Sequence, residues 1–196
     1  SSYAVKFTQI PEGYQLTTKE SAPSAVGSDA DPITGITAAV TVIGGQTDLT
    51  VDAGIYSTTK AALGNYVWLD TDQDGIQDAG ELGVPGVTVL LTRPGFGGDG
   101  IPGNADDANP VASAITDGNG LYFFSNLEAG IYDVQFTTLP TGLIFTTQNV
   151  TTPNDAGDSD ADPVSGMITG ITLVAGQVDP TNDAGLIPVE LGSVGD

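Results

Sequence analysis

The chain repeats itself, and the period of the repeat is the size of a whole domain. Three segments recur later in the chain: residues 3–8 match 132–137, residues 28–32 match 159–163, and residues 52–54 match 183–185. The offsets of 129, 131 and 131 residues are too long for a solenoid repeat and are typical of a single domain. We therefore expect tandem modules, with residues 1–60 as the C-terminal half of one module, 61–188 as a complete module and 189–196 as the start of the next module.

The complete module has dense strand signals and almost no helix signals. Runs of β-branched and aromatic residues alternate with clusters of Gly, Pro, Asn and Asp, which is typical of short strands joined by turns. We expect strands at residues 65–70, 87–92, 111–116, 121–125, 131–138, 143–148, 167–174 and 182–187. About seven or eight short strands indicate an all-β fold, a β-sandwich of immunoglobulin-like size. Strand alternation and residue type predict five core residues: Trp68, Tyr122, Phe124, Val134 and Phe136.

The first 60 residues carry only the last strands of such a sandwich. We expect these strands at residues 3–9, 13–18, 33–43 and 48–56, without the earlier strands of the complete module. An incomplete sandwich leaves strand edges unpaired and half of its core uncovered. We therefore expect another copy of the module to supply the missing strands, either within a longer chain or from a second subunit joined head to tail by strand complementation.

One loop of the complete module has the side-chain pattern of an EF-hand calcium site. Positions 1, 3, 5, 6, 9 and 12 of the loop hold Asp70, Asp72, Asp74, Gly75, Asp78 and Glu81. Ca²⁺ takes about six to eight oxygen ligands, and this spacing provides carboxylates, the carbonyl oxygen of Ile76 at position 7 and a closing glutamate. The flanks, residues 66–69 and 87–91, are typical of strands and not of helices. We therefore expect a structural ion on a β scaffold and not a calcium sensor. The alternative is an acidic surface loop that binds nothing.

Composition restricts the partners and the chemistry. The 25 acidic residues and 4 basic residues give a formal net charge of −21, which repels nucleic acid and anionic lipid headgroups. No apolar stretch approaches the roughly 18 residues that span a bilayer, so membrane insertion is not expected. The chain has no His, no Cys, no serine in a nucleophile elbow and no phosphate-binding glycine loop, and we expect no enzyme activity. Extracellular calcium concentrations suit a carboxylate site of ordinary affinity, which indicates an extracellular protein.

Three segments, in this order, carry a family resemblance: GNYVWLDTDQDGIQDAGELGVPGVTVLL, TDGNGLYFFSNLEAGIYDVQF and DSDADP. The chain resembles the calcium-binding B repeats, or SdrD B-like domains, of staphylococcal serine-aspartate repeat adhesins, which belong with the wider collagen-adhesin B-type modules. The resemblance covers residues 61–188 in full and residues 1–60 as a truncated copy. It implies a prealbumin-like β-sandwich, several calcium ions, and modules in tandem that form a stalk of a cell-surface protein or secreted fibre.

A second calcium site is predicted from alternating acids. Asp158, Asp160 and Asp162 share one face of an extended segment, where a cation between the carboxylates would offset their repulsion. The resemblance suggests that Asp117 and Asn119, from the turn before residue 121, complete this site. The alternative is a solvated acidic turn.

Two further acidic segments are weaker candidates. Asp29 and Asp31 form a remnant of the second site in the truncated copy, where Gly27 stands at the position that matches the first aspartate of the complete module. An insertion resembles calcium loops and provides a third candidate site through Asp99, Asn104, Asp106 and Asp107. A solvated acidic turn is again the alternative for the insertion.

The resemblance also bears on what stiffens the module. Many related pilin and adhesin modules are locked by a Lys-Asn isopeptide bond, but the lysines of this chain are Lys6, Lys19 and Lys60, and residues 64–188 contain none. Metal binding is then expected to stiffen the module. We predict a calcium-stabilised structural repeat of an extracellular surface protein, a rigid stalk or fibre-forming module whose partners are other copies of the module. The alternatives are a subunit of a calcium-dependent filament joined head to tail, and an adhesin or carbohydrate-binding module, although no aromatic cluster indicates an adhesion ligand.

Overall fold

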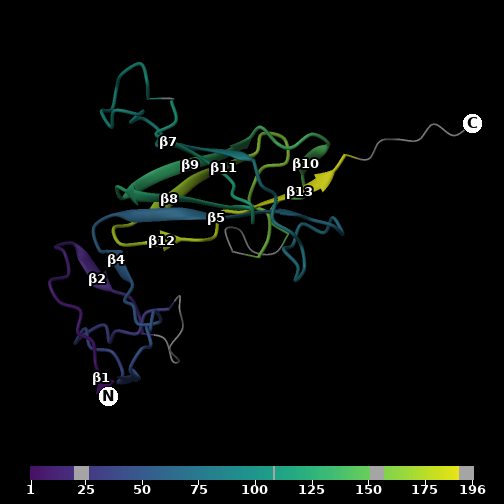
Figure 1. The fold of residues 1–196 in the computed structure, drawn as a ribbon. Coiled ribbons are helices and arrows are strands. Elements are labelled where there is room, and N and C mark those ends of the chain that lie inside the picture. The colour runs from purple at the N-terminus through teal and green to yellow at the C-terminus, as the bar shows by residue number, and fades with distance from the viewer. Residues whose placement is uncertain (20–26, 108, 151–156, 190–196) are drawn as a thin grey trace, which may run out of the picture. The chain divides into compact units, whose positions relative to one another are not determined.

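The computed structural model describes residues 1–19, 27–107, 109–150 and 157–189. The chain divides into two compact units, Ser1–Thr59 (unit 1) and Lys60–Asp196 (unit 2). All regular secondary structure in the described residues is β-strand, which confirms the predicted all-β class (Figure 1). No helix within these ranges has the length and apolar character needed to cross a membrane.

One sheet of unit 2 is built around the long strand β5 (Ala61–Leu69). β8 (Leu121–Leu127) pairs with β5 in antiparallel orientation. β12 (Val178–Asp179) and β13 (Ala184–Pro188) both pair with β5 in parallel, and β10 (Leu143–Phe145) continues the sheet beyond β13. Because β5 has neighbours along its whole length, it is largely buried and carries no alternating polar face.

The second sheet of unit 2 is antiparallel and has the order β11-β9-β6-β7. Its strands are β6 (Thr88–Thr92), β7 (Ala112–Ile115), β9 (Gly130–Thr137) and β11 (Met167–Leu173). Every second residue of β9 is buried, beginning with Tyr132, as the alternation in the sequence predicts. The two sheets form the layers of a sandwich (Figure 1).

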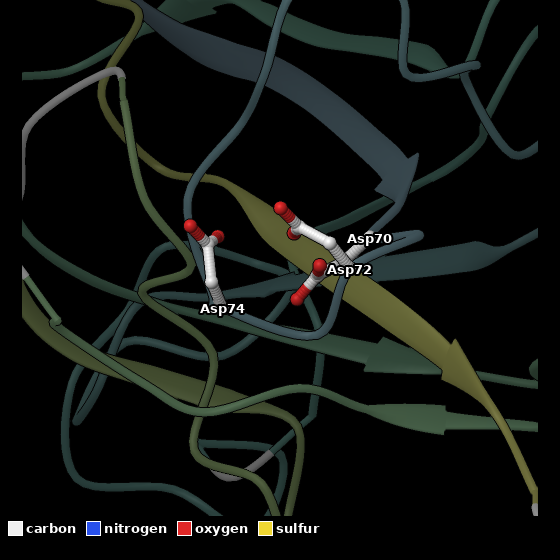
Figure 2. Close-up of side chains that lie close together, drawn as sticks. All are labelled: Asp70, Asp72 and Asp74. Carbon is white, nitrogen blue, oxygen red and sulfur yellow. The ribbon is translucent and has the colours of Figure 1, made fainter.

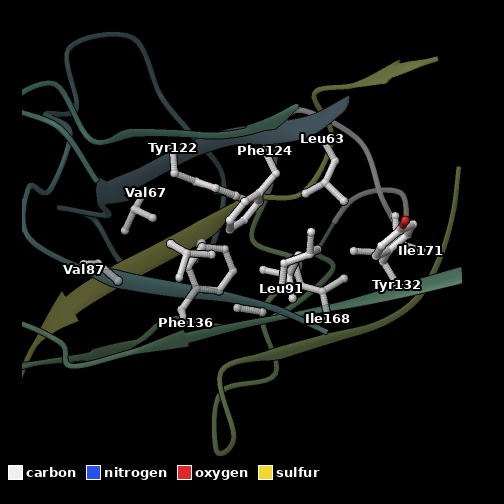
Figure 3. Packing of buried hydrophobic residues seen from close by; sticks show 14 of the residues in the cluster. Leu63, Val67, Val87, Leu91, Tyr122, Phe124, Tyr132, Phe136, Ile168 and Ile171 are labelled. Carbon is white, nitrogen blue, oxygen red and sulfur yellow. The ribbon is translucent and has the colours of Figure 1, made fainter. Parts of the chain in front are cut away.

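The core of unit 2 lies between these sheets (Figure 3). All five predicted core residues are buried, and Trp68 is fully enclosed. The ring of Tyr122 meets the rings of Phe124 and Phe136 edge to face, with centroids 5.9 Å and 5.5 Å apart. All five candidates are therefore buried as predicted; Tyr122, Phe124, Val134 and Phe136 belong to the cluster between the sheets, whereas Trp68 is buried outside that cluster.

Unit 1 has much shorter strands than the sequence predicts. β1 (Ser2–Tyr3) pairs with β3 (Val40–Thr41), and β2 (Tyr14–Leu16) pairs with β4 (Ile55–Ser57), both in antiparallel orientation. Each strand has one hydrogen-bonded neighbour, so the ladders end early.

In unit 2, the start of β5 and the presence of β12 differ most from the predictions, and several other strand ends differ by one to three residues. β5 begins four residues earlier than predicted, at Ala61, because its first residues pair with β8 and β12. β12 itself was not predicted, since two residues give no periodic signal. The predicted modules 1–60 and 61–188 remain an interpretation of the repeat, and residues 190–196 of the predicted third module lie outside the described residues.

Candidate metal centre

The first residue of the EF-hand-like loop is a buried and firmly held carboxylate. Asp70 follows the end of β5 and is fully buried. Its Oδ1 accepts a hydrogen bond from the Gln73 amide at 2.7 Å, and its Oδ2 accepts bonds from the Gly75 amide at 2.9 Å and the Thr146 hydroxyl at 2.5 Å. Gly75 has φ +82°, which a glycine adopts without strain. The loop is therefore folded around Asp70.

Three carboxylates of this loop converge. Asp70, Asp72 and Asp74 each offer an oxygen, and these oxygens all lie within 4.8 Å of one another (Figure 2). Desolvation and the neighbouring charge of Asp74 raise the pKa of Asp72 above its ordinary value. Like charges at this distance repel, and a cation among them would remove the repulsion.

The remaining predicted ligands close the loop. Oε1 of Glu81 accepts a hydrogen bond from the Thr71 amide at 2.6 Å, and Oε2 accepts one from the Asp78 amide at 3.0 Å. The Ile76 amide donates to Oδ1 of Asp74 at 2.8 Å. The twelve-residue pattern thus corresponds to one compact turn whose first and last acids are both tied to its backbone.

A segment far away in the sequence pairs with this loop. Ile76 and Asp158 form an antiparallel β-bridge, and the Ser159 amide donates to the Gly75 carbonyl at 3.1 Å. The first and second predicted sites are therefore neighbours in unit 2, joined by backbone hydrogen bonds.

The second acidic cluster is buried and includes a residue that the site prediction missed. Asp158, Asp160 and Asp183 are each at most 1% exposed. The Asp183 amide donates to Oδ2 of Asp160 at 3.0 Å, and the Asp160 amide donates to the Asp183 carbonyl at 2.9 Å. Oδ1 of Asp183 accepts from the Tyr66 amide and Oδ2 from the Asn65 side chain, both at 3.1 Å. Burial, and then the charges of Asp160 and Asp158, raise the pKa of Asp183 to about 8.

The repeat in the sequence contained the signal for Asp183. The triplet 183–185 matches residues 52–54, and unit 1 repeats the same hydrogen bonds. The Asp29 amide donates to the Asp52 carbonyl at 3.0 Å, and the Asp52 amide donates to Oδ2 of Asp29 at 3.1 Å. The two segments that recur at an offset of 131 residues therefore contain both members of the Asp160–Asp183 pair.

Asp162 and Asp31 have a different local role from their alternating neighbours. Oδ1 of Asp162 accepts hydrogen bonds from the amide and hydroxyl of Ser165, which lower the pKa of Asp162. Oδ1 of Asp31 accepts the same pair of bonds from Thr34, with the same effect on its pKa. Each carboxylate oxygen thus caps a turn, a local function that needs no ion.

Asp117 and Asn119 lie in the tight turn between β7 and β8. Oδ1 of Asp117 accepts from the amides of Asn119 and Leu121 at 2.8 Å and 2.9 Å. The backbone of Asn119 lies so close to Gly83 that no side chain would fit at that glycine. These contacts place the turn beside the exit of the EF-hand-like loop, whereas Asp160 lies beside β13. That Asp117 and Asn119 form one calcium site with the segment around Asp160 stays a prediction.

The third candidate site is an exposed loop between β6 and β7 (Figure 1). Oδ2 of Asp99 accepts from the Asn104 side chain at 3.0 Å, and Oδ1 of Asn104 accepts from the Asp106 amide at 3.2 Å. The Gly103 amide donates to Oδ2 of Asp107 at 2.8 Å. The four predicted ligands share one loop, and their role in calcium binding stays a prediction.

Comparison with known proteins places the chain in a family. The model of the SdrD B-like domain matches residues 1–55 and again residues 61–186. The chain belongs to the SdrD B-like domain family. A fibrinogen-binding protein of Staphylococcus epidermidis is 36% identical over 88% of the chain, and serine-aspartate repeat-containing protein D of Staphylococcus aureus strain Newman is 37% identical over 94%. The chain spans only 14% and 13% of the length of these two relatives.

Solved structures resemble the SdrD B-like chain more loosely. The minor pilin of Streptococcus agalactiae has a TM-score of 0.40 at 16% identity, covering 81% of this chain and 62% of the pilin. A streptococcal ancillary pilin has a TM-score of 0.41 at 16% identity, covering 91% and 46%. Scores of this size describe a loose likeness of fold. Membership of the SdrD B-like family confirms the predicted extracellular location.

The acids of this SdrD B-like domain fit a hard cation. The cluster of Asp70, Asp72 and Asp74 offers only oxygen ligands, and the chain has no His or Cys for a softer metal. The carboxylate oxygens of these three residues lie within 4.8 Å of one another, an arrangement that suits a cation that accepts carboxylates.

Proposed function

We propose that unit 2 is a calcium-stabilised structural module of an extracellular surface protein, where it serves as a rigid stalk or fibre-forming repeat. The convergence of three carboxylate oxygens within 4.8 Å carries this proposal. Calcium would be held by Asp70, Asp72 and Asp74, with the Ile76 carbonyl, Asp78 and Glu81 completing the shell. The family of the chain supports a structural role and gives no support to catalysis.

The position of the loop explains how an ion would stiffen the module. The loop follows β5 directly, and its middle is bridged to Asp158. An ion in the loop would therefore tie the end of the central strand to the segment that leads toward β11. Apo unit 2 carries this acidic charge uncompensated, so binding of calcium to the folded state would raise its stability.

Asp158, Asp160 and Asp183 are a second candidate for an ion, although among the described residues only Asp70, Asp72 and Asp74 bring three acidic ligand atoms within 4.8 Å of one another. These carboxylates are buried, and a buried charge is costly unless it is paired or bound to a metal. Burial and the charges of Asp160 and Asp158 raise the pKa of Asp183, and a cation at this cluster would counter both effects. Calcium at this cluster would hold Asp183 ionised and would tie the start of β13 to the segment around Asp160.

Thermal melts of the full chain test this function. Fluorescence of Trp68, the only tryptophan, reports on unit 2 alone. At 100 times the dissociation constant, calcium should add about 2.7 kcal/mol, which raises Tm by roughly 8–10 °C for a domain of this size. Asp74→Ala and Glu81→Ala should lose most of this rise, and Asp133→Ala, outside the acidic clusters, should keep it.

Equal melting in EDTA and in millimolar calcium would reject the proposal. Light scattering on the same samples addresses the alternative of a calcium-dependent filament. A calcium-induced rise in Tm without a change in scattering supports a stalk module, and a calcium-induced increase in scattering supports a filament subunit.

A further inference from the structure

A groove lies beside two short-paired edges of unit 2. β11 is an edge strand of the second sheet, and β12 has β5 as its one paired neighbour among the described residues. Residues 169–172 and 177–182 line this groove, which has a volume of about 530 Å³. Small-molecule sites have volumes of roughly 300–1,000 Å³, so the groove is large enough to hold a small ligand.

Hydrogen bonds within the chain fix the lining of the groove and leave polar groups available. The Asn65 side chain donates to the Pro180 carbonyl at 2.5 Å, and Oε1 of Gln177 accepts from the Val174 amide at 2.9 Å. Among the described residues, Nε2 of Gln177 and the hydroxyl of Thr169 have no hydrogen-bond partner. The groove therefore offers neutral polar groups to a ligand, and no basic residue lines it.

One residue of the groove, Asn182, carries a buried donor without an acceptor. Asn182 is 1% exposed, and its Nδ2 has no hydrogen-bond partner among the described residues. Its backbone is held in place, because the Tyr122 hydroxyl donates to the Asn182 carbonyl at 2.6 Å. Buried polar groups in folded proteins are nearly always hydrogen-bonded. This donor therefore indicates an acceptor that comes from outside the chain.

The charges near Asn182 restrict the chemistry of that acceptor. Burial, and then three carboxylates, raise the pKa of the Tyr122 hydroxyl well above its ordinary value. The carboxylates belong to Asp183, Asp160 and Asp179. Because this hydroxyl donates to Asn182, negative charge gathers close to the unpartnered amide. A carboxylate or phosphate ligand would be repelled, whereas a neutral carbonyl oxygen would not.

The edge strand beside the groove is a poor template for an added peptide strand. In the pairing of β11 with β9, Thr169 and Gly170 together oppose the single residue Asp133. The Gly170 amide donates to Oδ1 of Asp133 at 2.8 Å, which holds this bulge in place. A bulge bends the strand and disrupts its regular ladder of backbone groups. A ligand that binds through separate polar groups therefore fits the groove better than an extended peptide does.

We propose that this groove binds a neutral saccharide that carries an acetamido group. The acetamido carbonyl would accept a hydrogen bond from Nδ2 of Asn182, and ring hydroxyls would bond to the Thr169 hydroxyl and to Nε2 of Gln177. Val178, which is 55% exposed, offers an apolar contact to the sugar ring. The groove shares no residue with the EF-hand-like loop, and this binding function is separate from the structural role of unit 2.

The test titrates two disaccharides into the isotope-labelled full chain and follows the backbone amide signals by NMR. N,N′-diacetylchitobiose is the probe, and cellobiose is the matched control, because it has the same linkage with hydroxyls in place of the acetamido groups. The probe should shift the signals of residues 169–172 and 177–182, with an affinity about tenfold higher than that of cellobiose, as expected for one hydrogen bond. Absence of shifts in the groove, or equal affinity for the two sugars, would overturn the proposal.

Three variants locate the binding site. Asn182→Leu replaces an unpartnered buried amide with an apolar side chain of similar size, so it should lower the affinity for the probe about tenfold without lowering Tm. Thr169→Val removes a hydroxyl of the groove and should lower the affinity about threefold, and it decides the test if Asn182→Leu does not fold. Ser113→Ala, on β7 at the opposite edge of the sheet, should change neither quantity.

Unchanged affinity in the folded groove variants, or an equal loss in Ser113→Ala, would also overturn the proposal. The titrations are run in EDTA and in millimolar calcium. Sugar binding by a chain whose Tm does not respond to calcium would reject only the calcium function. A calcium-dependent Tm without sugar binding would reject only this inference.

Discussion

The buried carboxyl group of Asp183 should make calcium-free unit 2 less stable as the pH rises. Burial, and then the charges of Asp160 and Asp158, raise its pKa from 3.8 to about 8 in the folded state. The folded state thus holds this proton more tightly than the unfolded state. The resulting stabilisation is complete below pH 4 and is lost as the pH rises through about 8.

The size of this effect follows from the pKa difference. Between pH 5 and pH 7 the folded state retains the proton of Asp183 and the unfolded state has released it. The free energy of unfolding should then fall by about 1.4 kcal/mol per pH unit, or about 2.5 kcal/mol over this interval. For a domain of this size, the expected fall in Tm is roughly 8–10 °C.

The assay compares thermal melts of the full chain in EDTA at pH 5, 6 and 7, followed by the fluorescence of Trp68. Asp183→Asn removes the titrating group, so the free energy of unfolding of this variant should fall by about 2.5 kcal/mol less than that of the wild type over the interval. Asp133→Asn is the control, because that carboxylate lies outside the acidic clusters and accepts a hydrogen bond from the Gly170 amide. In the presence of calcium, the ion competes with the proton for Asp183, so the calcium-induced rise in Tm should grow with pH.

Parallel pH profiles of wild type and Asp183→Asn in EDTA would refute this reasoning. Such a result would mean that water or a movement of the β13 segment keeps Asp183 solvated in the folded state. A profile that flattens equally in Asp133→Asn would assign the pH dependence to the overall negative charge of the chain.

Two further predictions concern the EF-hand-like loop. Thr146→Val removes the hydroxyl that donates to buried Asp70, and it should lower the free energy of unfolding of calcium-free unit 2 by about 1–3 kcal/mol in urea. Thr146→Ser keeps the hydroxyl and should retain most of the stability. A valine variant as stable as the wild type would contradict the role of this bond. Gly75→Ala should weaken calcium binding in fluorescence titrations more than Gly80→Ala does. Both glycines have positive φ, but only at Gly75 would a Cβ meet backbone, because it would lie 2.8 Å from the Thr147 carbonyl oxygen. Similar affinities for the two alanine variants would show that the close contact at Gly75 has no effect on the loop.

The fold class and the core of unit 2 could be predicted from the sequence because both depend on local patterns. Alternation along residues 132–136 placed Tyr132 and Phe136 on the buried face, and turn residues marked the strand limits. Predictions for unit 1 were less accurate, since its sequence has the same patterns but its strands are short. Each strand of unit 1 has one paired neighbour among the described residues, and a local pattern does not contain this pairing.

The candidate site likewise has one part that the sequence predicts and another part that only the tertiary structure shows. The sequence by itself determined the loop from Asp70 to Glu81, because its predicted ligands fall within twelve residues, and three of them, Asp70, Asp72 and Asp74, converge in the structure. Only the tertiary structure decided that Asp183 joins Asp160 and that Asp158 lies against the loop. These acids are distant in the chain, and they meet because β13 pairs with β5 and the segment around Asp158 pairs with the loop that follows β5. Long-range strand pairing, unlike residue spacing, is settled by how the whole sandwich packs.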